Sequence, residues 1–181
     1  MLEHYEELTA CVSSPDSTMN EKLQTICQKI KEIAPNANRV SLWLFNQEAN
    51  EIFCLMCLES NGIMTNGQSL KKVDFPEYFD HILKNKVLSA SDARDNPATA
   101  CFNEVYFKPL NIFSLLDFIF HFQFKPTGVI CCEREGDITQ WSKDNINSLK
   151  RVANITSMFF SEEILSLSLE KEMILDAIKL N

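Results

Sequence analysis

Residues 89–133 read SASDARDNPATACFNEVYFKPLNIFSLLDFIFHFQFKPTGVICCE and carry the strongest structural signal in the chain. The first half contains two Asp-centred turns and is rich in turn residues, so it predicts an irregular loop. The second half is almost continuously apolar over residues 112–122 and 127–133, a pattern typical of central strands that are buried on both faces. Asp117 interrupts the first of these strands and Glu133 ends the second. Core packing alone does not require these acids, so the stretch predicts a small-molecule pocket beneath the loop.

The segments upstream of this stretch predict the rest of a sheet. Residues 39–45 and 51–58 are β-branched and aromatic and flank a turn, which indicates an antiparallel hairpin. A weak third strand is expected at 68–73 and a brief one at 87–90. Between them, Asp at the cap and Pro in the first turn favour a short helix over residues 74–83. Together with the two central strands, the sheet has about six strands.

Three apolar patterns at helical spacing lie outside the sheet. The first covers residues 1–12. The second can be capped by Asn20 or Ser17 and is stopped at Pro35, and the third starts at Ser142 and runs to the end without Pro or Gly. We therefore expect an α+β fold, with the N- and C-terminal helices on one face of an antiparallel sheet and the pocket loops and short helix on the other.

Three groups of residues, taken in order, resemble the GAF family. They are RVSLWLF at 39–45, the turns and apolar run of 89–133, and Trp141-Ser142. Over residues 20–160 this order and spacing are similar to GAF domains fused to bacterial sensor histidine kinases and diguanylate cyclases. The resemblance implies a non-enzymatic sensory domain of a signal-transduction protein, such as a two-component system, that binds a small molecule.

The resemblance and the helical patterns divide the chain into three parts. We expect an N-terminal helix or linker at 1–16, a GAF-like sensory domain at 17–160 and a signalling helix at 161–181. The last segment continues an apolar stripe that a single helix in water does not need. It predicts a homodimer through the terminal helices and an output domain, a histidine kinase or diguanylate cyclase, beyond this chain. The alternative is that this helix folds back over the domain.

Composition argues against several classes of partner. The formal net charge is -8 at pH 7, and the Lys and Arg residues are scattered, so we expect neither nucleic-acid nor membrane-surface binding. No apolar run approaches the roughly 20 residues of a membrane span. The N-terminal residues MLEHYEE lack the basic start and apolar core of a secretory signal, so we expect a cytoplasmic protein.

The seven cysteines raise the alternatives of a metal site and a redox switch. Cys54-x-x-Cys57 with Cys131 and Cys132 would be the metal site, but positions three apart on a strand point to opposite faces of a sheet. Cys101 lies in a loop and has no residue nearby in sequence that would activate its thiol. We therefore expect most cysteines to be packing residues, and no metal site.

No residue pattern predicts catalysis. The three histidines share no motif, and no glycine-rich loop is present to hold phosphates. One branch of the GAF family resembles free methionine sulfoxide reductases, but its reactive cysteines lie in glycine-containing loops that this chain does not match. A ligand-free dimerisation or interaction module and, more distantly, a thiol-based methionine sulfoxide reductase are the alternatives to a sensor. The cofactor remains unidentified.

Eight residues are candidates for contact with the ligand. Asp117 carries the main argument, because an unpaired carboxylate within an apolar strand costs several kcal/mol and needs a partner: Arg94, a backbone N–H or the ligand. Aspartates in turns more often cap the backbone, and aromatic side chains are as often core. The candidates are Trp43, Tyr78, Asp92, Arg94, Phe102, Tyr106, Asp117 and Glu133. Departures from the subtype at Asn111 and Arg134 prevent the transfer of any relative's ligand.

Overall fold

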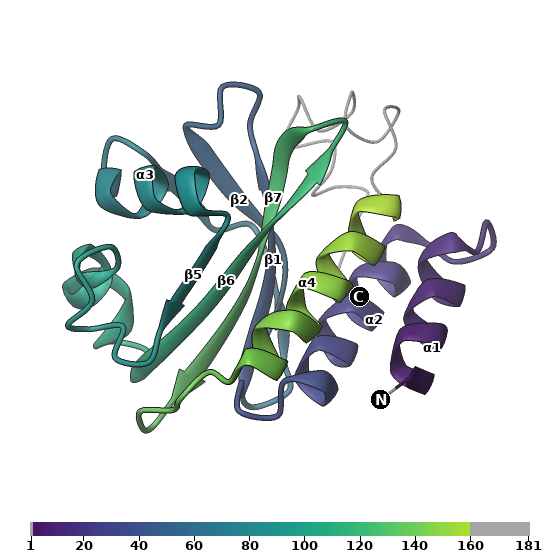
Figure 1. Cartoon of the computed structure of the whole chain (residues 1–181), viewed down its shortest axis with the longest axis horizontal. Helices are drawn as coiled ribbons and strands as arrows, with labels where there is room; N and C mark the ends of the chain where they lie inside the picture. The colour runs from purple at the N-terminus through teal and green to yellow at the C-terminus, as the bar shows by residue number, and fades with distance from the viewer. Residues whose placement is uncertain (1, 160–181) are drawn as a thin grey trace.

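A twisted antiparallel sheet separates two layers in the computed structural model, which describes residues 2–159 (Figure 1). Two of the helices pack directly on one face of the sheet and a third lies on their outer side, while a short helix with helical turns covers the other face. The helices are α1 (Leu2–Ser13), α2 (Met19–Ile33), α3 (Pro76–Asn85) and α4 (Lys143–Phe159), with a 3₁₀ turn η1 (Ala100–Phe102) and a π turn η2 (Asn103–Phe107). The strands are β1 (Arg39–Phe45), β2 (Glu51–Leu58), β3 (Met64–Thr65), β4 (Ser69–Lys71), β5 (Val87–Ala90), β6 (Ile112–Phe122) and β7 (Lys125–Glu135).

Within residues 2–159 the sheet has seven strands in the order β3-β2-β1-β7-β6-β5, and β4 also pairs with β2. All of the pairings are antiparallel. The expected α+β fold with its two differently covered faces is confirmed. The additional strand is β3, which is two residues long and therefore too short for an alternation of apolar and polar residues to reveal.

Strand alternation determines which side chains meet the helices. On β1, Val40, Leu42 and Leu44 point toward the layer of α2 and α4, and all three are fully buried. The same cluster takes Leu23, Ile26 and Ile30 from α2, which present one apolar stripe as the sequence predicted. Burying a side chain of this size stabilises the fold by about 1.5–3 kcal/mol.

Helix ends differ in part from the expectation. The N-cap of α2 is Thr18, not Asn20 or Ser17, because Thr18 and Glu21 form a reciprocal capping box. The short helix starts without a side-chain cap, since Phe75 and not Asp74 is its N-cap residue. The expected start of α4 is confirmed by a hydrogen bond from the backbone N–H of Asn145 to the hydroxyl of Ser142.

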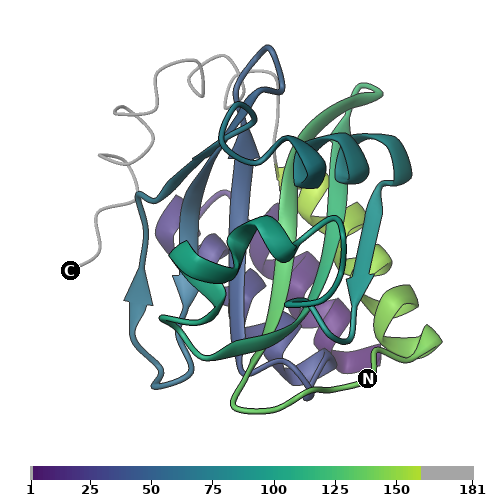
Figure 2. The same cartoon turned by 90° about the vertical axis from the view of Figure 1, so that its left-hand side faces the viewer.

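The opposite face of the sheet is covered by α3 and by the segment between β5 and β6, which crosses the strands in Figure 2. The other set of strand residues points into this layer, among them Trp43 on β1, Ile119 on β6 and Val129 on β7. Phe79 and Phe107 from the covering segments are fully buried against them. The sheet thus has a second core on this face.

One irregularity in β2 corrects the expectation for its cysteines. The pairing of β1 with β2 shifts by one residue between Leu42 and Trp43, which indicates a β-bulge. Because the bulge adds a residue, Cys54 and Cys57 both point into the covered core instead of to opposite faces. Cys131 belongs to the same core, whereas Cys132 faces the three helices.

The predictions for the C-terminal segment concern residues beyond those that the structure describes. The signalling helix expected at 161–181 lies outside the described residues, as does any homodimer contact made by that segment.

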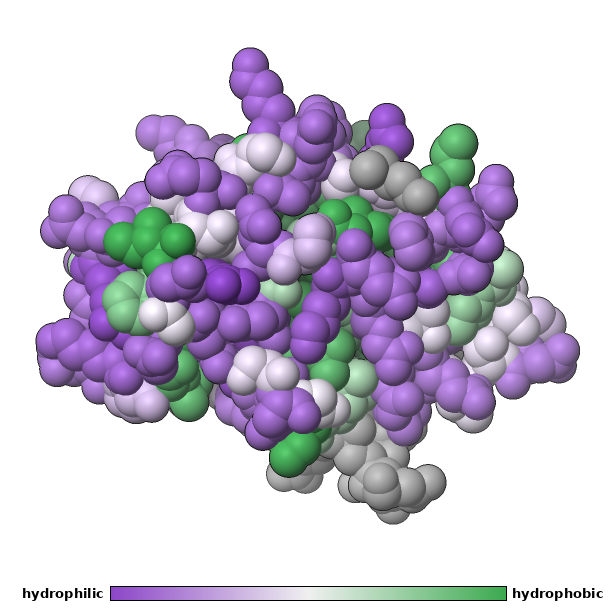
Figure 3. Space-filling view, turned by 90° about the horizontal axis from the view of Figure 1, so that it is seen from below, coloured by the Kyte–Doolittle hydropathy of each residue, from purple (hydrophilic) through white to green (hydrophobic). Residues whose placement is uncertain are grey.

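None of the helices in residues 2–159 is long and apolar enough to cross a membrane. The face shown in Figure 3 is largely hydrophilic, and its apolar residues form small separate groups.

Candidate functional site

A cavity lies between the covered face of the sheet and the segment that covers it. Its volume is about 30 Å³, enough for about two water molecules, so a larger ligand would require the covering segment to move away from the sheet. The walls are mainly aromatic and aliphatic, and two acidic side chains enter from β6 and β7. The lining residues are Trp43, Ile52, Leu70, Tyr78, Phe102, Tyr106, Phe107, Leu115, Asp117, Cys131 and Glu133.

Asp117 contacts both the covering layer and the neighbouring strand, where the Cys131 thiol also interacts with its carboxyl. Its side chain is 2% exposed, and its Oδ2 accepts a hydrogen bond of 2.6 Å from the hydroxyl of Tyr78 on α3. Its other oxygen, Oδ1, has no hydrogen-bond partner among the described residues. Of the three partners that the sequence offered, Arg94 does not contact Asp117, because its guanidinium donates to backbone carbonyls. One oxygen of this buried carboxyl is thus without a partner beside the cavity.

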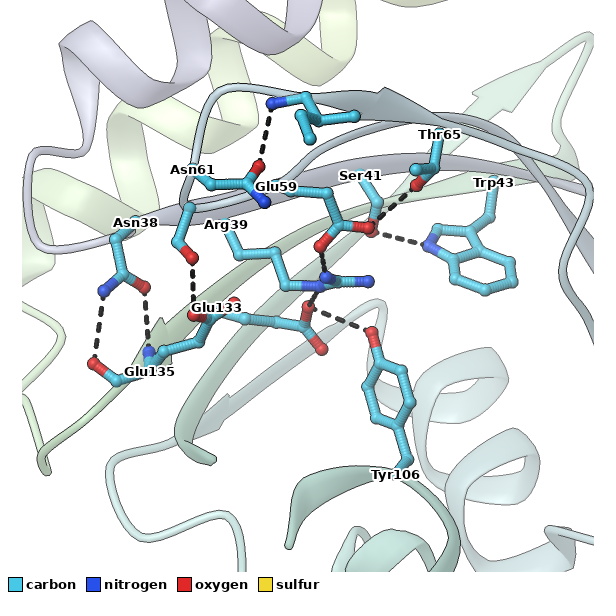
Figure 4. Close-up of polar contacts among 12 residues, drawn as sticks. Asn38, Arg39, Ser41, Trp43, Glu59, Asn61, Thr65, Tyr106, Glu133 and Glu135 are labelled. Atoms are coloured by element: carbon cyan, nitrogen blue, oxygen red, sulfur yellow. Dashed lines mark hydrogen bonds and ion pairs between the residues drawn. The ribbon is translucent and has the colours of Figure 1, made fainter. Parts of the chain in front are cut away.

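Glu133 lies in a network of charges at the other end of the cavity (Figure 4). Its Oε2 accepts hydrogen bonds from Nε of Arg39 at 2.8 Å and from the hydroxyl of Tyr106 at 3.1 Å. Arg39 also forms an ion pair with Glu59, which follows β2. Figure 4 shows the guanidinium between the two carboxylates, with Tyr106 reaching Glu133 from the covering layer. Oε1 of Glu133 has no hydrogen-bond partner among the described residues.

Glu133 is more enclosed than the sequence suggested. A strand end can usually reach water, but β7 continues to Glu135 and Tyr106 covers the carboxyl, so Glu133 is only 1% exposed. In the sheet register Arg39 lies opposite Glu133 and Cys131 lies opposite Asp117. Asp117 and Glu133 are therefore diagonal neighbours on one face of adjacent strands, a relation that places side chains roughly 7–8 Å apart.

Burial shifts both acids toward their neutral forms. It raises the pKa of Asp117 to about 6, although the Cys131 thiol and the Tyr78 hydroxyl oppose the rise. It raises the pKa of Glu133 to about 7, against the influence of Arg39 and with support from Asp117. Such shifts arise where a carboxylate has lost water without gaining a full set of partners.

Six of the eight candidate residues line this one cavity: Trp43, Tyr78, Phe102, Tyr106, Asp117 and Glu133. Asp92 does not line it, because its exposed carboxylate accepts hydrogen bonds from the backbone N–H groups of Arg94 and Asp95. Arg94 also lies outside the lining. Its guanidinium donates to the backbone carbonyls of Ile112 and Phe107 and stacks on the ring of Phe113. Arg94 therefore stabilises the conformation of the covering loop.

Sequence reasoning did not include Arg39, Glu59 or Cys131 among the site residues. Arg39 could have been found, because it occupies the same face of its strand as Trp43 and pairs with the strand that carries Glu133. Cys131 also lines the cavity, because it is two residues from Glu133 on β7 and therefore lies on the same face of the sheet. Glu59 lies just beyond a strand end in a turn, where the sequence gives no indication of its direction.

Among residues 2–159, no group of three or more His, Cys, Asp or Glu side chains is arranged to hold a metal ion. All seven cysteines are free thiols. Burial, together with Asp117 and Glu133, raises the pKa of Cys131 well above its ordinary value. Burial is also the main cause of a raised pKa at Cys101. A raised pKa reduces the thiolate population on which nucleophilic reactivity depends.

No protein-family model matches this sequence, and no curated protein matches it. Solved structures do resemble it. The GAF domain of a phosphoenolpyruvate-protein phosphotransferase from Acinetobacter has a TM-score of 0.66 and 12% identity over 87% of this chain and 90% of that one. The GAF domain of a two-component sensor histidine kinase from Bacillus halodurans has a TM-score of 0.62 and 17% identity over 84% of this chain and 99% of that one.

An enzyme shares the same architecture. The free methionine-R-sulfoxide reductase from Neisseria meningitidis, determined in complex with its substrate, has a TM-score of 0.65 and 13% identity over 92% of this chain and 90% of that one. Identities this low establish a common fold, whereas the chemistry of each protein depends on the residues of its own cavity.

Proposed function

We propose that this chain, which has the fold of GAF domains, is a non-enzymatic sensory module that binds a small molecule in the cavity between the sheet and its covering segment. The observation that carries the proposal is the pair of buried acids in the cavity wall. Asp117 and Glu133 each keep one oxygen without a partner, and among the unpartnered buried side-chain atoms of residues 2–159 only these two belong to residues that line the cavity. A bound ligand would supply the missing hydrogen bonds.

The placement of the cavity supports a switching role. Tyr78 from α3 and Tyr106 from η2 both reach acids on the central strands, so the covering layer is attached to the sheet through the same side chains that line the cavity. A ligand that contacts these acids would change the free energy of attachment. It would thereby shift the population of conformations available to the domain.

We further propose that the chain acts as a homodimer and passes its ligand state through the helix that begins with α4 to an output domain, such as a histidine kinase or a diguanylate cyclase. The GAF neighbour from a sensor histidine kinase supports this output class. The coupling would act through the sheet face that α4 covers, because Leu149, Val152 and Ala153 pack there.

Native mass spectrometry of the protein purified without added ligand tests the proposal. We expect a species heavier than the polypeptide by the mass of a small molecule, which denaturation releases and which can then be identified. A protein that carries no adduct, and that binds nothing in a subsequent screen of metabolites by thermal shift, would contradict a sensory pocket.

A ligand-free interaction module is the second candidate, and the aromatic packing favours it. The ring of Phe102 contacts those of Phe75, Tyr78 and Phe107, with centroids 4.5, 5.1 and 5.6 Å away, so the cavity is partly filled by the protein itself. A Phe102→Ala variant distinguishes the two. It should enlarge the cavity and alter ligand binding in a sensor but leave dimerisation unchanged.

A methionine sulfoxide reductase is less well supported, although one structural neighbour has this activity. Cys131 is the one thiol that lines the cavity in the described part of the chain, and its raised pKa disfavours the reactive thiolate. An assay for reduction of free methionine sulfoxide with a thiol reductant tests this alternative. We expect a rate no higher than that of the variant Cys131→Ser.

A further inference from the structure

The cavity wall is asymmetric in its hydrogen-bonding capacity. Asp117 Oδ1 and Glu133 Oε1 are acceptors without a partner, and both belong to side chains at most 2% exposed. The hydroxyls of Tyr78 and Tyr106 already donate to the second oxygens of these carboxyls. The indole N–H of Trp43 donates to the hydroxyl of Ser41 at 2.8 Å. The Tyr and Trp donors of the wall are therefore used, and the unused oxygens are acceptors when the two acids are ionised.

The charges around the cavity are unbalanced in the same direction. Arg39 is shared between two carboxylates, Glu59 and Glu133. Asp117 forms no ion pair with any Lys, Arg or His of residues 2–159. When ionised, the three acids exceed the cation available to them, and a low local dielectric makes this excess costly.

The remaining walls suit an organic cation with an apolar body. Tyr78, Phe102 and Tyr106 provide aromatic rings, and Leu70 and Leu115 provide aliphatic surface. Ring faces attract cations, and this attraction strengthens when water is excluded. An anion would be repelled by the two carboxylates. It would also bring a third hydrogen-bond acceptor to a place where two acceptors already lack a donor.

We propose that the cavity selects a small organic cation, a protonated amine or amidine on an apolar body, which donates hydrogen bonds to Asp117 Oδ1 and Glu133 Oε1. The inference rests on the proposed sensory function and specifies the ligand class of the same cavity. Because the two acids are diagonal neighbours on β6 and β7, a cation with at least two N–H donors can contact both once the covering segment moves to admit it.

Two matched sets of probes test the ligand class by isothermal titration calorimetry with the full chain. The first is phenethylamine, phenethyl alcohol and phenylacetate, and the second is benzamidine, benzamide and benzoate. Each set keeps the apolar body and changes the head group from cation to neutral to anion. We expect each cation to bind roughly 10- to 100-fold more tightly than its neutral partner, and the anions not to bind.

Three variants locate the interaction. Asp117→Asn keeps an acceptor for the Tyr78 hydroxyl but removes the negative charge, so it should weaken cation binding by about 10-fold or more. Glu133→Gln is a second, independent variant for the other acid. Asp95→Asn is the matched control, because Asp95 is exposed on the covering segment outside the cavity lining, and it should bind the cations as the wild type does.

The outcomes separate the ligand class from the function. Neutral or anionic probes that bind as tightly as the cations would overturn the inference and leave the sensory function standing. The same holds if native mass spectrometry identifies a retained neutral or anionic molecule. If none of the six probes binds, the ligand class fails. If the purified protein also carries no adduct and binds nothing in the metabolite screen, the sensory function fails as well. The wild-type comparison of head groups remains decisive even if a variant does not fold.

Discussion

Tyr78 and Asp117 join helix α3 to strand β6 through one buried hydrogen bond of 2.6 Å. In Asp117→Ala the Tyr78 hydroxyl loses its partner, and a small cavity forms as well. At pH 5, where Asp117 is mostly protonated in the folded protein, we expect the free energy of unfolding in urea to fall by about 1–3 kcal/mol for the lost partner alone. Asp117→Asn, which keeps an acceptor, should lose less. Equal stability of Asp117→Ala and the wild type would show that this carboxyl is hydrated and idle.

Arg39 neutralises two acids at once, so its removal should be more costly than the removal of a surface cation. In Arg39→Met, Glu59 and Glu133 lose their shared guanidinium, and we expect a loss of about 3–5 kcal/mol in chemical denaturation. Lys72→Met is the control, because its ion pair with Asp80 is largely exposed and should contribute less than about 1 kcal/mol. Similar losses in the two variants would contradict a buried network.

Protonation of the two cavity acids gives the unliganded domain a specific pH dependence. Burial raises the pKa of Asp117 from 3.8 to about 6 and that of Glu133 from 4.5 to about 7. Between these values the folded state binds more protons than the unfolded state, so the free energy of unfolding falls as pH rises from about 4 to about 7. Each group contributes on the order of 3 kcal/mol to this loss. The ionisable groups that face them are Arg39 on β1, Cys57 on β2, Tyr78 on α3, Tyr106 on η2 and Cys131 on β7.

Urea denaturation at several pH values between 4 and 8 measures this slope. The double variant Asp117→Asn/Glu133→Gln provides the comparison, because it lacks both titrating groups while other carboxyls remain. We expect the difference between the two proteins to reproduce the loss of stability with rising pH. A difference that does not vary with pH would mean that both acids titrate near their ordinary values.

At the scale of elements, Gly128 allows β7 to lie against β1 and β6. A Cβ at this position would be 2.0 Å from the backbone oxygen of Trp43 and 2.4 Å from Cζ of Phe120. Gly128→Ala therefore requires a backbone shift in the central strands and should cost about 1–3 kcal/mol or more by thermal unfolding. Gly62→Ala meets no atom within 4 Å and should cost only about 1 kcal/mol for its positive φ. Equal losses would show that the strands adjust freely.

The long strands were predictable because their apolar character extends over seven or more residues, as in β1, β2, β6 and β7. The cap of α2 was missed although Thr18 and Glu21 have the spacing of a capping box, since two neighbouring residues are also good caps. The bulge in β2 could not be read from the sequence, because an extra residue in a strand leaves no compositional mark.

For the site, too, some features could be predicted from the sequence and others could not. Residue type alone identified Trp43, Asp117 and Glu133 as candidates, since two are acids in or at the end of apolar strands and one is an aromatic residue, and all three line the cavity. Alternation does not apply to the loop before β6, so the sequence could not show that Arg94 turns to backbone carbonyls. Partners from different elements, such as Tyr78 for Asp117, depend on how a helix lies over the sheet, which local sequence does not specify.

At the scale of the whole molecule, the sequence of residues 161–181 predicts a contact between two copies of the chain. This segment lies outside the described residues, and its apolar positions include Ile164, Leu167, Ile174 and Ile178. Size-exclusion chromatography with light scattering should show a dimer for residues 1–181 and a monomer for residues 1–160. Far-UV circular dichroism should show that the shorter protein keeps its fold. A shorter protein that stays dimeric would place the interface on the domain body.

The order of strands in the sheet has a consequence for how the protein folds. The hairpins β1–β2 and β6–β7 are local, but the ladder between β1 and β7 joins Arg39 to Glu133, which are 94 residues apart in sequence. Closing so long a loop has an entropic cost that precedes any gain from the contacts, so this ladder should limit the folding rate. The cavity lies across this seam, with Trp43 on one side and Asp117 and Glu133 on the other. A partly folded chain that contains both hairpins would therefore have no binding site, and the capacity to bind would report completed folding.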